Sequence, residues 1–374
     1  MGLIKPLPAQ VAKIKVVGVG GGGGNTVNFM ASQEEINGVD LVSINTDAQA
    51  LLVSQAKIKI QIGEKLTKGL GAGGNPQVGQ EAAEESREKI KEVLDGTDMV
   101  FITGGLGGGS CSGGAPVVAR IAKDELGALT IGVVTKPFLF EGTKRMVVAE
   151  DALAKLREEV DALIIIPNQR LLELGEEDLS FLDAFRMADN VLSRSVTGIA
   201  ELITTSGLIN IDFADLRSVI QNAGTAVMGV GIASGDDRVE KAIKAAISSP
   251  LLDTQIEGAR GVLFNITGGL DLSIKEVEQI AKKITESIGT DANVVFGAAI
   301  DEKLKDQLKI TLIATGFDPQ RKTLTGLIKQ SKPQSILEKV DSEEKDRLVK
   351  MDLPEGVEIE TELDIPSFLR RGNN

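Results

Sequence analysis

Short apolar runs alternate with amphipathic stretches through the first half of the chain. The runs are rich in β-branched residues and span residues 13–19, 40–45, 99–103, 130–135 and 162–166. Such runs are typical of parallel strands that are buried on both faces. Stretches 77–94 and 114–126 between them carry apolar residues at helical spacing. This alternation predicts βαβ units in a doubly wound α/β sheet, which binds ligands at the carboxyl ends of its strands.

The second half predicts a long helix, a further domain and a tail. Helical spacing of apolar residues covers 178–205 and indicates a helix that joins two domains. The α+β pattern after it has expected strands at 225–232, 261–267, 293–299 and 309–314 and expected helices at 237–247 and 273–288. Beyond Asp318 polar residues dominate without periodicity, as in a flexible tether. The chain then ends in a short amphipathic segment suited to docking on a partner.

Two glycine-rich loops each follow an expected strand and precede an expected helix. Their sequences are GVGGGGGN at 18–25 and GGLGGGSCSGG at 104–114. Glycine lets the backbone approach a bulky anion, and a helix N-terminus directs free N–H groups at that anion. Two such loops in one domain indicate a polyphosphate held from two sides, and therefore a nucleotide. A third turn-rich loop, at 69–76, could cover the same edge of the sheet.

The glycine loops leave more than one kind of nucleotide site open. Gly18, Gly20 and Gly23 fit the G-x-G-x-x-G dinucleotide pattern, so an NAD(P)-dependent oxidoreductase stays possible, as does a merely tight turn. The P-loop pattern with its lysine is absent from the sequence. Backbone amides and the hydroxyls of Ser110 and Ser112 would then hold the phosphates. Without the P-loop lysine, bound Mg²⁺ becomes more necessary, although no metal ligand can be named.

Composition narrows the class of protein. A formal charge of −13 argues against binding to nucleic acid or to an anionic membrane surface. The absence of histidine excludes Ser-His-Asp catalysis and the usual zinc sites. One cysteine, Cys111, allows no intrachain disulfide and fits a reducing compartment. The apolar runs are too short to cross a bilayer and no signal peptide is visible, so we expect a cytoplasmic protein without direct membrane insertion.

Two further groups of residues suit the chemistry of a nucleotide. Asp212 and Asp215 lie on one turn after the long helix, where they could polarise an attacking water or simply cap the next helix. Phe185 and Asp189 lie four residues apart and so share a helix face. A ring beside a carboxylate suits guanine, which stacks on the ring and donates hydrogen bonds to the carboxylate. A core phenylalanine beside a surface aspartate is the plainer interpretation.

Taken together, these segments resemble the FtsZ family of tubulin-like bacterial cell-division GTPases. The resemblance covers essentially the whole chain. The family's GGGTGTG signature stands here as GGGSCSG at 107–113, its first loop as 18–25 and its synergy loop NxDFAD as 210–215. Residues 45–49, 69–76, 135–145 and 167–168 also match family loops, and DIPSFLR at 364–370 resembles the C-terminal peptide. So many ordered matches make a chance likeness implausible.

The resemblance implies a site for GTP or GDP with Mg²⁺ and a separate catalytic loop. Guanine would lie between Phe185, Asp189 and Asn25. The nucleotide-binding residues that it implies are Gly21, Gly22, Asn25, Ala72, Gly73, Gly105, Gly107, Gly108, Gly109, Ser110, Cys111, Ser112, Gly113, Glu141, Arg145, Asn168, Phe185 and Asp189. The catalytic residues that it implies are Asn210, Asp212 and Asp215.

The resemblance also implies an assembly and a domain plan. Subunits would stack head to tail into filaments, so that the synergy loop of one subunit reaches the GTP of the next and hydrolyses it. Asp364–Arg371 would bind membrane-tethering division proteins such as FtsA, which would place this cytoplasmic protein at the mid-cell division ring. The implied segments are a Rossmann-like GTP-binding domain at 1–177, a central helix at 178–208, an α+β domain at 209–318, a variable linker at 319–360 and a partner-binding peptide at 361–374.

Three positions in the phosphate loop depart from the family signature. Ser110 and Ser112 replace threonines and keep the hydroxyls, whereas Cys111 replaces a glycine. The Cβ of Cys111 restricts positive φ and would narrow the space beside the phosphates. A polymer that binds GTP but scarcely hydrolyses it is therefore an alternative. Cys111 could also be open to oxidation if the helix N-terminus favours its thiolate.

Overall fold

The computed structural model describes residues 12–33, 38–174, 179–204, 207–247, 256, 258–288 and 292–317. These residues belong to one compact unit, 1–318. The predicted tether at 319–360 and the predicted peptide at 361–374 lie outside the described residues. Within the described part, no helix has both the length and the apolar character needed to cross a bilayer.

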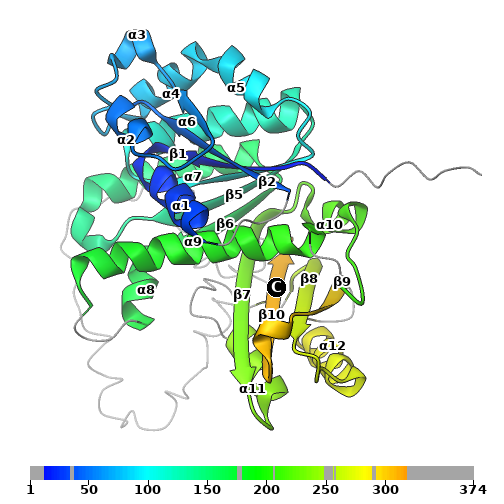
Figure 1. The fold of residues 1–374 in the computed structure, drawn as a ribbon. Helices are drawn as coiled ribbons and strands as arrows, with labels where there is room; N and C mark the ends of the chain where they lie inside the picture. The colour runs from blue at the N-terminus through cyan, green and yellow to red at the C-terminus, as the bar shows by residue number, and fades with distance from the viewer. Residues whose placement is uncertain are drawn as a thin grey trace, which may run out of the picture. The chain divides into compact units, whose positions relative to one another are not determined.

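The first half of the chain alternates strands and helices as its apolar pattern predicts (Figure 1). Its strands are β1 (Ile14–Val19), β2 (Val39–Asn45), β3 (Ile58–Gln61), β4 (Met99–Gly105), β5 (Leu129–Lys136) and β6 (Ala162–Pro167). Its helices are α1 (Gly20–Ser32), α2 (Ala48–Leu52), α3 (Glu64–Thr67), α4 (Pro76–Glu85), α5 (Arg87–Leu94), α6 (Gly109–Arg120), α7 (Thr143–Glu159) and α8 (Asn168–Leu174). A π-helical turn (Ile121–Glu125) extends α6, and a 3-10 turn (Leu139–Glu141) precedes α7.

A long helix, α9 (Phe181–Thr204), connects this half to the second one, as predicted over 178–205. The elements that follow are α10 (Phe213–Ile220), β7 (Gly224–Ser234), α11 (Arg238–Ile247), β8 (Gly261–Gly268), α12 (Ile274–Ile288), β9 (Asn293–Ile300), a 3-10 turn (Glu302–Leu304) and β10 (Gln307–Thr315). All four strands and both helices expected between residues 225 and 314 are confirmed. In Figure 1, α9 crosses between the parallel strands of the first half and the strands β7 to β10.

The ten strands of the described residues join in one sheet, in the order β3-β2-β1-β4-β5-β6-β7-β10-β8-β9. Pairing is parallel from β3 to β7, antiparallel on both sides of β10, and parallel again between β8 and β9. The sequence indicated two separate domains and not this continuity. Three residue pairs, from Ala162↔Gly224 to Ile164↔Ala226, form the junction between β6 and β7. Buried Asp161 supports it by accepting backbone N–H groups from Thr130 at 2.9 Å and Asn222 at 3.2 Å.

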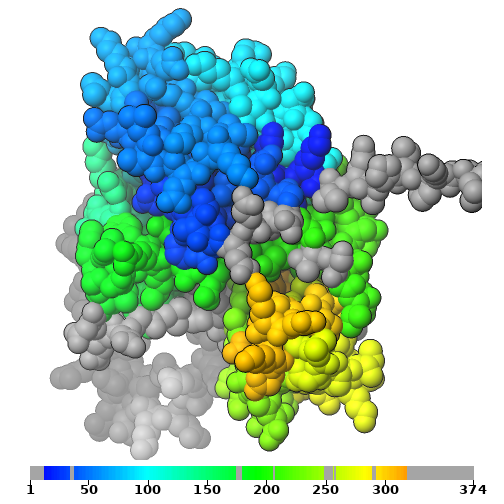
Figure 2. Space-filling view, in the orientation of Figure 1, coloured from blue at the N-terminus to red at the C-terminus, as the bar shows by residue number. Residues whose placement is uncertain are grey.

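Both faces of the central parallel strands are buried, which explains why their sequences are rich in apolar residues. Successive residues alternate between two cores: Met99 and Phe101 of β4 face one, and Val100 and Ile102 face the other. The first core contains side chains of α1 and α9, and the second contains those of α4 to α7. A third core lies between the C-terminal strands and helices α11 and α12. On the face shown in Figure 2, the blue N-terminal elements and the yellow-to-orange C-terminal elements form two separate groups.

The structure adds two local features that the apolar pattern does not reveal. Residues 77–94 are not one helix, because α4 ends at Glu85 and α5 begins at Arg87. At the break, the hydroxyl of buried Ser86 accepts the backbone N–H of Gly63 at 3.1 Å, a contact that a continuous helical pattern does not reveal. The four-residue strand β3 was not predicted. Among the described residues it pairs with β2 alone, at the edge of the sheet, and Lys59 and Gln61 alternate with its two isoleucines.

Candidate functional site

A cavity of about 300 Å³ opens at the carboxyl ends of the parallel strands. Its walls come from the starts of α1 and α6, the ends of β4 and β5, the turn before α7, the start of α8 and one face of α9. The lining residues are Gly20, Gly21, Gly22, Asn25, Gly105, Leu106, Gly108, Gly109, Ser110, Cys111, Thr135, Pro137, Glu141, Arg145, Asn168, Phe185, Ala188, Asp189 and Leu192. The sequence placed a ligand at this edge of the sheet, and the cavity lies there.

The first glycine loop forms a tight turn from β1 into α1. Gly20 has φ +74°, a left-handed conformation that glycine adopts without strain. A Cβ on Gly22 would lie 3.0 Å from the amide nitrogen of Gly105, so glycine allows the two loops to approach each other. No side chain caps the start of α1. The first amides of this helix therefore have no capping side chain and are available to an anion in the cavity.

The second glycine loop is held in shape by its own hydroxyls. Ser112 Oγ accepts the backbone N–H of Gly107 at 2.9 Å, and Gly107 has φ +99°. Ser110 Oγ lies 2.6 Å from the hydroxyl of Thr46 in the neighbouring loop. Gly108 precedes α6, and no side chain caps this helix. Ser110 lines the cavity. Ser112 is buried outside the lining and stabilises the loop through its hydrogen bond to Gly107.

Five of the predicted binding residues do not line the cavity: Ala72, Gly73, Gly107, Ser112 and Gly113. Glycine at position 113 instead allows α6 to approach α4, because a Cβ there would lie 1.9 Å from the carbonyl oxygen of Pro76. Ala72 is buried, and its methyl group would lie 2.8 Å from a Cβ on Gly109. Gly73 is exposed with φ +58°. Close packing against α4 and the loop before it thus accounts for part of this glycine run.

Cys111 is one of the lining residues, but its side chain is buried and packs in the core. It is 4% exposed and belongs to the core that α6 shares with the sheet, and a Cβ on Gly104 would lie 2.5 Å from its sulfur. Its φ is not positive, so the Cβ brings no backbone strain. Burial raises the pKa of the thiol to about 12. Burial and the raised pKa therefore favour an unreactive thiol over the oxidisable one that a helix start could produce.

One end of the cavity combines an aromatic ring with a carboxylate, as the spacing on α9 predicted. Phe185 packs edge-on against Phe138, with ring centroids 5.2 Å apart. Asp189 is half-buried, and Thr26 of α1 donates a hydrogen bond to its Oδ1 at 3.1 Å. Burial raises the pKa of this carboxyl to about 6, and the hydrogen bond from Thr26 opposes that rise.

The other wall holds an ion pair and an unpartnered amide. Arg145 Nη1 pairs with Glu141 Oε2, and the other oxygen of Glu141 accepts the backbone N–H of Phe138 at 2.9 Å. Asn168 is buried, and its Oδ1 has no hydrogen-bond partner among the described residues. Because a buried oxygen without a partner is costly, Asn168 indicates that a donor from a ligand completes the site.

The sequence analysis did not name six lining residues as binding residues: Gly20, Leu106, Thr135, Pro137, Ala188 and Leu192. Helical periodicity could have found two of them, since Ala188 and Leu192 lie three and seven residues after Phe185. Thr135 and Pro137 lie in a segment that the family resemblance matched to the ribose and phosphate side, although neither was named as a binding residue. The contact between Thr26 and Asp189 carries no local signal, because 163 residues separate them.

The predicted catalytic residues lie outside this cavity. Asp212 caps α10 by accepting the backbone N–H of Asp215 at 2.7 Å, and both side chains are exposed. Asn210 Oδ1 accepts the backbone N–H of Gly207 at 2.5 Å. The preceding Ile209 pairs with Ala298 of β9 through two backbone hydrogen bonds, at 3.0 and 3.1 Å. The predicted capping role of Asp212 is therefore confirmed. The loop at 210–215 (the acidic loop) is anchored to the edge strand β9 through Ile209.

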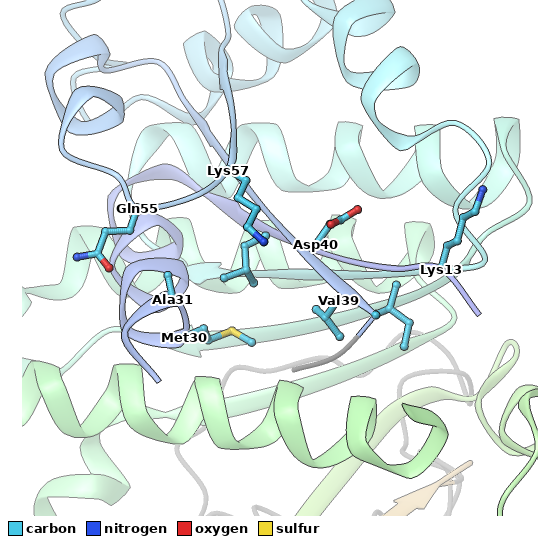
Figure 3. Close-up of a pocket in the computed structure, with 10 residues that line it drawn as sticks. Lys13, Met30, Ala31, Val39, Asp40, Gln55 and Lys57 are labelled. Atoms are coloured by element: carbon cyan, nitrogen blue, oxygen red, sulfur yellow. The ribbon is translucent and has the colours of Figure 1, made fainter. Parts of the chain in front are cut away.

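Neither a metal centre nor a second nucleotide site is evident in the described residues. No group of three or more acidic or cysteine side chains among them could hold a metal ion. A larger cavity, of about 510 Å³, lies at the amino ends of β1 and β2 (Figure 3). There Lys13, Lys57 and Asp40 stand beside apolar Met30 and Val39. Neither glycine-rich loop contributes to this cavity, and ligands of α/β sheets bind at the opposite strand ends.

Comparisons with known proteins agree with this geometry. A model of the Tubulin/FtsZ family GTPase domain matches residues 13–176, and one of the FtsZ family C-terminal domain matches residues 224–318. An empty FtsZ dimer from M. jannaschii is 46% identical, with a TM-score of 0.77 over 82% of this chain and 88% of that chain. CetZ2 from Haloferax volcanii, solved as a GTPgS-bound protofilament, is 22% identical with a TM-score of 0.69, over 85% of this chain and 98% of that one. That likeness shows the fold alone. The chain therefore belongs to the FtsZ family of tubulin-like cell-division GTPases, and its parallel sheet forms the GTPase domain.

Proposed function

We propose that this protein assembles head to tail and hydrolyses GTP at a site completed between two subunits. The observation that carries the proposal is the composition of the cavity. Its acidic lining residues are Glu141 and Asp189. Glu141 pairs with Arg145, and Asp189 lies at the end of the cavity beside Phe185, where the guanine base would bind (the base end). The sequence contains no histidine that could act instead. A carboxylate that activates water must therefore come from outside the described lining.

The exposed loop at 210–215 can supply that carboxylate to a neighbouring subunit. Asp212 uses one oxygen to cap α10, and its exposed position leaves lone pairs for a water molecule. Asp215 lies on the same turn and is also exposed. In this proposal the two carboxylates polarise the water that attacks the γ-phosphate of the next subunit. Asn210 holds the loop in shape through Gly207.

Exposed apolar side chains support a contact between opposite ends of the molecule. Near the cavity, the exposed set is Leu139, Phe140, Phe181 and Leu182. At the other end, near the acidic loop and the carboxyl ends of β8 and β9, the exposed set is Leu208, Ile209, Leu270 and Ile274. A contact that joins two different faces does not close on itself, so it produces a filament. Residues of the cavity and of the acidic loop would meet at this contact.

A mixing experiment tests the shared site. Asp212→Asn keeps a side chain that can cap α10 but removes the charge, and Gly22→Val blocks the approach of the two glycine loops. Each variant alone should lose most GTP turnover. Their mixture should recover part of it, because an intact cavity can meet an intact Asp212 in a mixed filament.

Asp151→Ala, which removes an exposed carboxylate on α7, is the matched control and should keep the parent rate. Phosphate release and sedimentation would be measured together over a range of protein concentrations. Turnover per subunit that stays constant as the protein is diluted below its assembly threshold would refute the shared site. So would full turnover by Asp212→Asn alone.

GTP and Mg²⁺ fit what the cavity offers. The unpartnered Asn168 and the two uncapped helix starts suit a ligand that carries both hydrogen-bond donors and phosphates. Mg²⁺ commonly keeps several waters and binds through substrate phosphates, where it neutralises developing charge. The alternative of a polymer that binds GTP but scarcely hydrolyses it has less support, since the side chain of Cys111 packs in the core and its φ is not positive. Membership of a GTPase family likewise removes the support for an oxidoreductase.

We further propose the cellular setting and the domain plan that the family membership favours. The protein would form a cytoplasmic ring at the mid-cell division site, and Asp364–Arg371 would bind a membrane-tethering division protein such as FtsA. The proposed boundaries are 1–177, 178–208, 209–318, 319–360 and 361–374. Pull-down of the parent chain and of a chain ending at residue 360 with FtsA tests the tail. Equal capture of the two would refute its role.

A further inference from the structure

The side chain of Thr26 stands behind the wall of the nucleotide cavity. Thr26 lies in α1, is fully buried, and does not line the cavity itself. Its hydroxyl lies 3.1 Å from Oδ1 of Asp189, which does line the cavity. This bond joins α1 to α9 across the base end of the site. Thr26 is therefore placed to control the carboxylate without touching the ligand.

Two acceptors compete for the single hydroxyl proton of Thr26. The carbonyl oxygen of Gly22, one helical turn earlier, also lies 3.1 Å from the hydroxyl. Bonds of this backbone type are common for threonine within helices. An ionised carboxylate is the stronger acceptor, so the proton belongs to Asp189 when that side chain is charged. When Asp189 is neutral, the hydroxyl can turn back to Gly22.

The charge of Asp189 matters because of what a purine base presents. Guanine offers two neighbouring donors, its N1–H and its 2-amino group, and an ionised carboxylate accepts both. Xanthine has a carbonyl group in place of the amino group. It therefore matches a protonated carboxyl, which donates one hydrogen bond and accepts another. The protonation state of one side chain thus separates two nucleotides of almost identical shape.

We infer that Thr26 is a specificity-determining positioning residue, whose hydroxyl holds the carboxylate of Asp189 ionised and oriented toward the base, so that guanine is preferred over xanthine. The inference rests on the proposed function, which places guanine at Asp189. It adds a residue that the family resemblance did not assign.

Among the groups around Asp189, the Thr26 hydroxyl is the main one that stabilises the ionised carboxylate. Burial raises the pKa of Asp189 to about 6, and the bond from Thr26 acts in the opposite direction. Helix α1 contributes no titratable side chain between residues 20 and 32. On α9, Arg186 lies one turn away, is exposed and pairs with Asp183 at 3.5 Å. The titratable groups that share the cavity are the paired Glu141 and Arg145, together with the core thiol of Cys111. On α8, Arg170 pairs with Glu173.

The test compares three variants of the full chain by calorimetric binding of GDP and of XDP, between about pH 5 and about pH 8. Thr26→Val keeps the shape of the side chain but removes the hydroxyl. Thr26→Ser restores the hydroxyl. Thr130→Val is the matched control, because Thr130 is also fully buried and its hydroxyl bonds a backbone carbonyl, at the far ends of the strands.

We expect the GDP affinity of the parent chain to fall as the pH drops below about 6, since protonation removes one acceptor. In Thr26→Val this fall should begin about one pH unit higher, and the preference for GDP over XDP at neutral pH should shrink roughly ten-fold. Thr26→Ser should restore both properties. Thr130→Val should leave both unchanged.

Each other outcome has a definite meaning. If Thr26→Val keeps the parent pH profile and the parent preference, Thr26 has only a structural role and the inference is wrong. If Thr26→Val does not fold, Thr26→Ala and Thr26→Ser decide the same question by the same two readouts. In chains that carry Asp189→Asn, Thr26→Val should cause no further pH shift, and a shift there would also overturn the inference. If the parent chain binds neither nucleotide, the proposed function itself fails.

Discussion

Two adjacent glycines in α6 should respond in opposite ways to the same substitution. A Cβ on Gly113 would lie 1.9 Å from the carbonyl oxygen of Pro76 and 2.5 Å from the amide nitrogen of Gln80. Ordinary contact begins near 3.4 Å, so α4 and α6 would have to separate by about 1.5 Å. A Cβ on Gly114 meets its nearest neighbours at 3.6 Å, which needs no movement.

These distances set the expected magnitudes. Overpacking at position 113 should cost about 3 kcal/mol, against a gain of about 1 kcal/mol for alanine over glycine within a helix. Gly113→Ala should therefore lower the free energy of unfolding by about 2 kcal/mol. Gly114→Ala should raise it by up to about 1 kcal/mol. For a compact unit of about 300 residues, this difference of about 3 kcal/mol separates the two melting temperatures by roughly 5 °C.

The assay is thermal and urea unfolding of the parent and both variants, followed by GDP binding. Because the start of α6 lines the cavity, Gly113→Ala should also weaken GDP binding, whereas Gly114→Ala should not. Equal melting temperatures for the two variants would refute the close-approach reasoning. So would a loss of GDP binding in Gly114→Ala without any loss in Gly113→Ala.

Three further predictions concern single side chains. Phe181→Glu places a charge on an apolar side chain that is 70% exposed. It should reduce GTP-dependent sedimentation at least ten-fold, while GDP binding stays near the parent value. Unchanged sedimentation would contradict this prediction. Asp189→Asn should stabilise the nucleotide-free protein by on the order of 1 kcal/mol at pH 7.5 but not at pH 4. The folded-state pKa of about 6 lies above the unfolded value, so charging Asp189 costs stability as pH rises through about 6; urea unfolding at both pH values checks the sign. Cys111 should react with a thiol reagent only as fast as the protein unfolds, because burial raises the pKa of its thiol to about 12. Fast labelling of the folded protein would show that the side chain is accessible.

Most of the fold could be predicted because its strands carry their signal locally. Strands β4 and β5 are buried on both faces, so both are rich in apolar residues and the runs stand out in the sequence. Strand β3 could not be predicted in this way, since it is short, lies at an edge and alternates polar residues with isoleucine. The break at Ser86 depends on Gly63, 23 residues away, and no local pattern encodes that contact.

The candidate site shows the same division. Spacing on one helix brought Phe185 and Asp189 together, because residues four apart share a face whatever the tertiary structure is. The second glycine loop was harder, since a glycine that contacts a ligand and one that contacts a neighbouring helix look alike in a sequence. Gly108 lines the cavity, whereas Gly113 packs against α4. Only the approach of α4 to α6 distinguishes them.

The pairing of Ile209 with Ala298 has a practical consequence for enzyme assays on this protein. Strand β9 is an edge of the sheet, and the two backbone bonds from Ile209 occupy part of that edge. Open strand edges recruit other chains and promote aggregation. A substitution that loosens residues 207–210 therefore uncovers hydrogen-bonding groups as well as displacing the acids. Lost GTP turnover in such a variant can result from aggregation of the protein. The particle size of the variant should therefore be measured before the loss is attributed to the catalytic residues.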